Sequence, residues 1–190
     1  MEPFKKIKSI ATPLDKVNVD TDQIVPKQFL KLIQRTGFGQ YLFYDWRYEK
    51  GGLPRKDFVL NNPEYQNSRI LLARDNFGCG SSREHAVWAL DDYGFKVIIS
   101  TSFADIFYNN CFKNGILPIC VSDETLERLF STKSEIEVDL ETQSIKVGNV
   151  SISFQIEQHW KKILLEGLDD IAMTLLHEDQ IANYERFHKI

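Results

Sequence analysis

The strongest constraint on the fold of this chain is an alternation of apolar runs and helical segments across its middle. Three short runs rich in branched apolar residues have the character of buried strands, RILLA at 69–73, KVIISTS at 96–102 and ILPICV at 116–121. A segment with helical spacing and turn or cap residues follows each run. This order predicts an α/β core with parallel strands, because each helix serves as the crossover to the next strand.

Less regular segments flank this core. Residues 8–29 contain short strand-like pieces that Pro and Asp interrupt, and residues 134–156 alternate polar and apolar positions around two polar turns, which predicts a hairpin. Apolar residues at helical spacing in 167–190 predict one amphipathic helix. We therefore expect one domain over 1–190, with a β/α core, β-rich flanks and a helical extension at about 157–190.

Composition and charge exclude several classes of protein. The net charge of −4 gives no electrostatic basis for binding nucleic acid or an anionic membrane. The N-terminus lacks the apolar run of a signal peptide, so we expect a cytoplasmic protein. Cys79, Cys111 and Cys120 form no CxxC pair, and the histidines are scattered, so the chain is predicted to build no disulfide and no metal site of its own.

The segment RDNFGCGSSREHAVWAL, residues 74–90, is the best candidate for a functional site. It follows an expected strand and leads into an expected helix. Gly78 and Gly80 allow unusual backbone conformations and a close approach of a ligand to the main chain. Arg83 adds a fixed positive charge near a helix N-terminus, and its planar fork of donors matches a carboxylate. The segment is typical of a site for an anion.

Known glycine motifs do not match this segment, and a purely structural interpretation is available. The spelling excludes GxxxxGK[ST], GxGxxG and GxSxG, and with them the nucleotide P-loop, the dinucleotide fingerprint and the hydrolase elbow. Ser81 and Glu84 also have the S-x-x-E spacing of a capping box. In that interpretation Ser81 only begins a helix and Arg83 is solvated. Residue spacing alone leaves both interpretations open.

Three segments resemble one family. NVDTDQIVPKQFL at 18–30, GCGSSREHA at 78–86 and NNCFKNGILPI at 109–119 are similar, in this order along the chain, to the swivelling domain of the aconitase superfamily. The length of the chain and its lack of a cluster-binding cysteine motif fit the separate small subunits of isopropylmalate isomerase. The resemblance covers nearly the whole chain and implies a β/β/α swivelling domain.

The resemblance also implies an activity, a cofactor and a partner. A protein of this kind interconverts 2-isopropylmalate and 3-isopropylmalate by dehydration and rehydration in leucine biosynthesis, as a hydro-lyase. It acts with a large subunit, which carries a [4Fe–4S] cluster, and this chain binds no cofactor alone. The substrate is a small diacid, and neither nucleic acid nor membrane is involved.

Roles for individual residues follow from the same resemblance. Ser81 matches the family's catalytic base, which removes a proton from carbon, and Asp22 matches an active-site aspartate. Arg83 matches the arginine that binds a substrate carboxylate.

Further positions are carried over from the same family. Ser82 matches a second active-site hydroxyl, and Gly80 is expected beside the substrate. Arg35 is a candidate for a second carboxylate ligand, although the register around it is not a clean match. The loop at 30–39, with Leu32 and Ile33, is a candidate for the selection of the substrate side chain.

Two alternatives for the function stay open at this point. The same motif serves the small subunits of homoaconitase and of citraconate (methylmalate) hydratase, so the substrate is not fixed by it. A non-catalytic module that binds a small diacid without a partner would carry the same glycine–serine segment. Activity with and without a large subunit distinguishes these alternatives.

Overall fold

The computed structural model describes residues 1–31 and 36–188, and its centre is a four-stranded parallel sheet. The strand order is β2-β3-β4-β5, and every neighbouring pair is parallel. The strands are β2 (Ala11–Leu14), β3 (Ile70–Ala73), β4 (Val97–Ser100) and β5 (Leu117–Cys120). The predicted parallel core is confirmed. Strand β2 forms one edge of this sheet and comes from the first third of the chain.

Three helices follow the strands of this sheet, as the alternation predicted. They are α3 (Glu84–Tyr93), α4 (Asp105–Lys113) and α5 (Asp123–Phe130). Gly94 ends α3 in a left-handed conformation, with φ of 118°. The side chain of Ser122 begins α5 by accepting a hydrogen bond from the backbone N–H of Thr125. The sequence predicted these two helix ends because glycine is common just after a helix and serine just before one.

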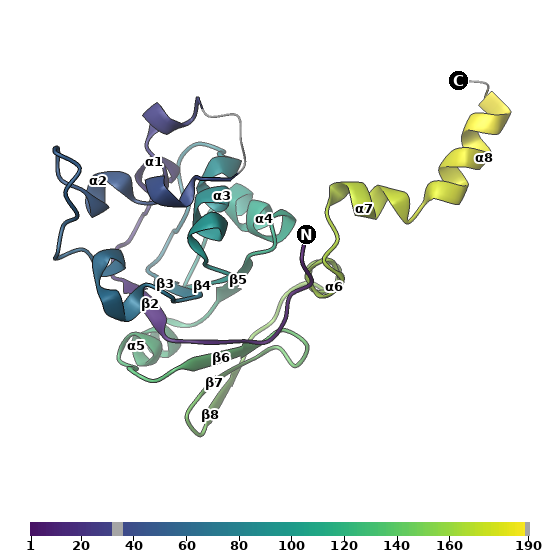
Figure 1. Cartoon of the computed structure of the whole chain (residues 1–190). Helices are drawn as coiled ribbons and strands as arrows, with labels where there is room; N and C mark the ends of the chain where they lie inside the picture. Colours follow the sequence, from purple (N-terminus) through teal and green to yellow (C-terminus); the bar gives the residue numbers. More distant parts are fainter. Residues whose placement is uncertain (32–35, 189–190) are drawn as a thin grey trace.

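The parallel sheet lies between a layer of helices and the antiparallel sheet (Figure 1), and one apolar core packs on each of its faces. Because successive side chains of a strand point to opposite faces, Leu71 packs with α3 and α4 while Ile70 and Leu72 pack with the second sheet. All four residues of β3 are buried, and so are those of β4. The layers are helices, parallel sheet and antiparallel sheet, which confirms the β/β/α architecture implied by the resemblance.

The second sheet is antiparallel and has the order β1-β6-β7-β8. Its strands are β1 (Ile7–Ser9), β6 (Ile136–Asp139), β7 (Ser144–Val147) and β8 (Val150–Ser153). The expected hairpin at 134–156 is therefore a three-stranded meander, to which the N-terminal strand adds a fourth. The sequence pattern could not show this pairing, since Ile7 lies opposite Val138, far away in the chain.

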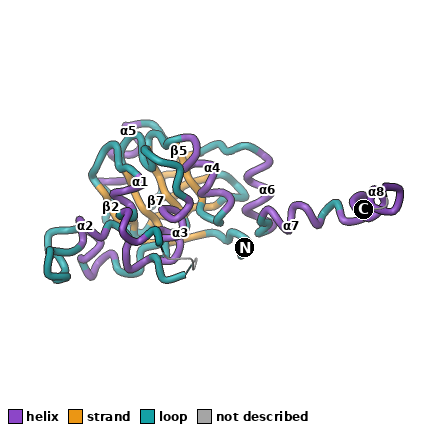
Figure 2. Tube along the Cα trace, turned by 90° about the horizontal axis from the view of Figure 1, so that it is seen from above, coloured by secondary structure: helices purple, strands orange, loops and turns teal. Residues whose placement is uncertain are grey.

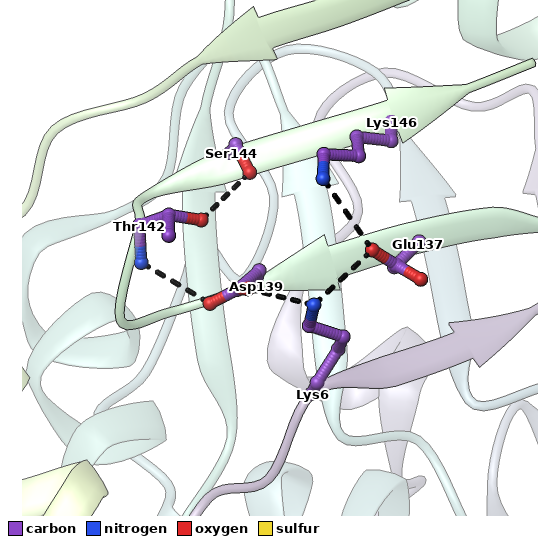
Figure 3. Close-up of polar contacts among 6 residues, drawn as sticks. All are labelled: Lys6, Glu137, Asp139, Thr142, Ser144 and Lys146. Carbon is purple, nitrogen blue, oxygen red and sulfur yellow. Dashed lines mark hydrogen bonds and ion pairs between the residues drawn. The ribbon is translucent and has the colours of Figure 1, made fainter. Parts of the chain in front are cut away.

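Ion pairs join the N-terminal segment to the antiparallel sheet (Figure 3). Lys6 Nζ lies 3.0 Å from Asp139 Oδ2 and 3.4 Å from Glu137 Oε1. The backbone N–H of Thr142 donates to Asp139 Oδ1 at 3.1 Å. Burial would raise the pKa of Asp139, but these partners outweigh it and lower the pKa below its ordinary value.

The first third of the chain covers the helical face of the parallel sheet with short elements. The helices that the structure describes there are α1 (Thr21–Ile24) and α2 (Tyr44–Arg47). Single 3-10 turns lie between and after them, namely η1 (Lys27–Phe29), η2 (Gly39–Tyr41), η3 (Val59–Asn61) and η4 (Pro63–Tyr65). Buried side chains from this part, such as Phe38 and Phe43, complete the core on that face.

The C-terminal part contains three helices, α6 (Gln158–Glu166), α7 (Asp170–Leu175) and α8 (Glu178–His188). The single helix expected over 167–190 is wrong, because the chain turns between α7 and α8. Only α6 contributes buried residues, and α7 and α8 extend away from the body of the molecule (Figures 1 and 2). In the described ranges, no helix combines the length and the apolar character needed to cross a membrane.

Candidate active site

The glycine–serine segment, residues 76–83, forms an extended turn between the end of β3 and the start of α3. Gly78 and Gly80 have φ of 78° and 88°, in the region that favours glycine. A Cβ on Gly78 would lie 2.1 Å from Cγ of Phe107, so no other residue fits there without displacing that ring. The turn is thus held in one shape by a buried neighbour.

The segment before α1 supports this turn on one side. Gly78 N–H donates to the carbonyl of Val19 at 2.7 Å, and Thr21 N–H donates to the carbonyl of Cys79 at 2.9 Å. The hydroxyl of Thr21 also donates to the carbonyl of Ser81, at 2.9 Å. Two of the three segments that resemble the family are therefore joined by backbone contacts, although about 60 residues separate them.

The segment after β4 supports the turn on the other side. Phe77 N–H donates to the carbonyl of Ser102 at 3.2 Å, and Ala104 N–H donates to the carbonyl of Phe77 at 3.1 Å. The turn thus lies between two strand ends at the carboxyl edge of the parallel sheet. This edge is where parallel α/β folds commonly place their ligands.

The interpretation of Ser81 and Glu84 as a capping box is wrong. Helix α3 begins at Glu84, and its N-cap position is Arg83, without a side-chain cap hydrogen bond. Glu84 Oε1 instead accepts a hydrogen bond from Asn114 Nδ2 at 2.9 Å. Ser81 and Ser82 are exposed, and no described residue forms a hydrogen bond with either hydroxyl.

A capping box does exist in α1, where sequence reasoning did not expect it. Asp20 accepts a hydrogen bond from Gln23 N–H at 2.7 Å, and Asp20 N–H donates to Gln23 Oε1 at 2.9 Å. The spacing Asp-x-x-Gln in VDTDQ was the signal that could have found it. This box begins the short helix that carries Asp22.

The structure pairs Asp22 with Arg83. Arg83 Nη1 hydrogen-bonds Asp22 Oδ1, and Lys27 Nζ lies 3.6 Å from Asp22 Oδ2. Burial by itself would raise the pKa of Asp22, but the hydrogen bond and charge of Arg83, with a smaller contribution from Lys27, outweigh it and lower the pKa. Asp22 is therefore a carboxylate at neutral pH, placed to hold the guanidinium of Arg83.

A cavity of about 250 Å³ opens beside these groups. Its lining combines the turn with the start of α4, through Thr21, Gly78, Gly80, Ser81, Ser82, Arg83, Ala104, Asp105, Ile106 and Phe107. Four of the expected site residues thus share one cavity, and the fifth, Asp22, contacts Arg83.

The lining residues Asp105 and Ile106 were not expected from the sequence. They follow the KVIISTS strand. In a parallel sheet this strand and RILLA end at the same edge, so the sequence could have predicted that the residues after KVIISTS lie near the glycine–serine segment. Arg35, Leu32 and Ile33 lie outside the described residues.

The cysteines do not form a metal site in the described part of the chain. Cys79 is half-buried, Cys111 is buried and Cys120 is exposed, and no group of three metal-binding side chains gathers among the described residues. Burial raises the pKa of the Cys79 and Cys111 thiols, assisted at Cys79 by the charge of Asp20. An iron–sulfur cluster is held by several cysteine thiolates that lie close together, and the described cysteines form no such group, so they do not fit a cluster.

Comparison with known proteins identifies the family. Residues 1–124 match the family described as the aconitase C-terminal domain. This chain belongs to that family. Similar proteins include the 3-isopropylmalate dehydratase small subunits of Brevibacillus brevis, 54% identical over 97% of this chain and 98% of the relative, and of Shouchella clausii, 55% identical over 97% and 96%.

A solved structure supports the same assignment. The crystal structure of 3-isopropylmalate dehydratase from Methanocaldococcus jannaschii DSM2661 has a TM-score of 0.69 and 25% identity, over 96% of this chain and 99% of that chain. The resemblance to the small subunits within the aconitase superfamily is confirmed.

Proposed function

We propose that this chain is the small subunit of 3-isopropylmalate dehydratase, a hydro-lyase of the cytoplasm that interconverts 2-isopropylmalate and 3-isopropylmalate in leucine biosynthesis. The observation that carries the proposal is the shared cavity of Ser81, Ser82 and Arg83, with Asp22 holding the arginine. The hydroxyls and the guanidinium suit a small substrate with carboxylates. The three free cysteines are consistent with a reducing compartment.

Ser81 is the base in this proposal. During dehydration the ionised Oγ takes the proton from a substrate carbon, the electrons of that C–H bond form the carbon–carbon double bond, and the hydroxyl leaves the neighbouring carbon as hydroxide, for which the cluster of the partner would supply the Lewis acid. Rehydration returns the proton and the hydroxyl to exchanged positions. A serine needs a positive field to act as an oxyanion, and Arg83 and the nearby N-terminus of α3 supply it.

Arg83 binds a substrate carboxylate, and Asp22 positions it. Asp22 contacts Arg83 through Nη1, and within the described ranges the other guanidinium nitrogens form no ion pair. Those donors can therefore meet a carboxylate of the diacid. Ser82 offers a second hydroxyl, and Gly80 lets the substrate approach the backbone because it carries no side chain.

The [4Fe–4S] cluster belongs to the partner large subunit in this proposal. The cysteines of this chain are separate from one another and do not fit a cluster, as described above. The complete active site forms when the cavity of this chain faces the partner. The chain alone is then expected to be inactive.

An activity assay on the isopropylmalate pair, with and without the large subunit, tests this proposal. We expect interconversion only when both subunits are present. Hydration of citraconate, or turnover of homologous tricarboxylates, without turnover of isopropylmalate would assign the alternative hydratase or homoaconitase. Tight binding of the diacid by this chain alone, with no turnover in the complex, would contradict the enzyme assignment.

A further inference from the structure

The C-terminal arm, residues 168–188, exposes large apolar side chains along its two helices. Helices α7 and α8 have no buried residue. The exposed fractions of these side chains run from 40% at Ile181 to 86% at Phe187. The set is Ile171, Leu175, Leu176, Ile181, Tyr184 and Phe187.

These side chains recur at helical spacing along the arm. Ile171 and Leu175 are four residues apart in α7, and Ile181 and Tyr184 are three residues apart in α8. Residues at these spacings lie on one face of a helix. An exposed apolar face of this kind marks an interaction surface more often than an isolated apolar residue does.

The base of the arm is built into the fold. The amino group of Met1 donates to the carbonyl of Gly167 at 3.1 Å and lies 3.7 Å from the carboxylate of Asp169, which begins α7. A Cβ on Gly167 would lie 2.7 Å from the carbonyl oxygen of Met1. Lys113 of α4 pairs with Asp170 at 3.7 Å. The base of the arm is therefore joined to the body, while no residue of α7 or α8 is buried.

We propose that the C-terminal arm docks its apolar face on the large subunit of the dehydratase. The inference rests on the proposed function. The relatives named as small subunits match 97% of this chain, so nearly all of the arm lies within the region shared with proteins that work beside a second chain. An apolar helical face in a groove of a partner is a common recognition mode.

The charge of the arm favours a protein partner over other occupants. Five acidic residues and one arginine lie between 168 and 188. This excess of negative charge opposes an anionic membrane surface and nucleic acid. It also opposes the pairing of two arms side by side, because both would carry the same charge. The surface of the large subunit that fits this arm is an apolar groove with basic side chains at its rim.

The test compares variants of the full chain in binding to the purified large subunit. The arm variant combines Leu175→Ser, Ile181→Ser and Phe187→Ser. The matched control combines Gln180→Ser and Asn183→Ser, which change polar residues of α8. Dissociation constants come from titration calorimetry or surface-based kinetics, and the melting temperature and mass of each isolated chain are measured by scanning calorimetry and sedimentation.

We expect the arm variant to bind the large subunit about tenfold more weakly or worse, as loss of apolar anchors does at interfaces. The control should bind like the wild type, and all isolated chains should melt alike. Equal binding of the arm variant would overturn the inference, as would a dimer of the isolated wild type that the arm variant loses. Failure of the wild type itself to bind the large subunit would instead contradict the proposed function.

Discussion

The glycine–serine turn and the C-terminal arm both expose side chains, but the fold holds them differently. The turn is fixed by backbone hydrogen bonds on both sides and by a glycine that meets a buried ring. The arm is fixed at its base by Met1 and Lys113, and its outer residues contact solvent. The turn presents polar groups in a small cavity, and the arm presents apolar groups along a surface.

This difference is consistent with the roles that we propose for the two regions. A catalytic group works only within a narrow range of positions, so its backbone is fixed by neighbours on every side. A docking segment gains its contacts when the partner arrives, so it needs only a defined starting point. Substitutions in the two regions test whether the fold holds the turn more firmly than it holds the arm.

The largest effect is expected from Ser81→Ala in the assembled enzyme. Loss of the base should lower kcat by about 10²–10⁴-fold, the range typical of general-base steps. Because Ser81 is exposed and does not cap α3, the melting temperature should stay that of the wild type. Steady-state kinetics and calorimetry measure the two quantities. A variant with normal kcat would remove Ser81 from the mechanism.

A pair of identical truncations compares the body with the arm. Leu164→Ala removes a side chain that is 1% exposed in the core, and we expect a loss of about 2–5 kcal/mol in the free energy of unfolding. Leu175→Ala removes the same atoms from the arm, where the change should stay within about 0.5 kcal/mol. Urea unfolding of the isolated chains gives both values. Equal losses would show that the arm is packed in solution.

Two glycines with the same backbone angle test how tightly the turn is held. Gly78 and Gly52 both have φ of 78°, but a Cβ would overlap Phe107 at Gly78 and meet nothing within 4 Å at Gly52. Gly78→Ala should therefore cost about 1–3 kcal/mol more stability than Gly52→Ala, the usual range for overpacking. Chemical denaturation provides the comparison, and similar losses for the two variants would argue against a rigid turn.

The smallest effect concerns the pH dependence of the Asp22–Arg83 pair. The pKa of Asp22 is lowered in the folded state, so its ionised form stabilises the protein above the ordinary carboxyl value of 3.8. This contribution is lost as the pH falls through the lower folded pKa. Asp22→Asn should cost less than about 1 kcal/mol at pH 7, since the pair is partly solvated, and the cost should vanish well below pH 4.

The control for this titration is Asp45→Asn, which changes an exposed carboxyl of α2 with no ion pair among the described residues. Unfolding free energies are measured from pH 7 to pH 3 for this control, for Asp22→Asn and for the wild type. A difference between wild type and Asp22→Asn that grows on acidification would contradict the pairing.

The buried strands and helix ends of the core were predictable, and the long-range pairings were not. Ile70–Ala73 and Val97–Ser100 are strands because both faces of the sheet are covered, which makes their sequences continuous apolar runs. No local sequence pattern predicts the pairing of Ile7 with Val138, because the two residues are far apart in the chain. The turn between α7 and α8 was missed because the apolar spacing continues through it.

The sequence by itself placed the glycine–serine segment at the end of a buried strand, because the order of strands and helices brings the ends of the parallel strands to one edge. It also determined the family, through segments whose spelling is specific. Only the tertiary structure decided that Asp22 holds Arg83, that Ser81 is free of a capping role, and that the arm stands apart from the core. The local sequence pattern reflects burial and backbone preference, whereas these three features depend on contacts, or their absence, between segments that are far apart in the chain.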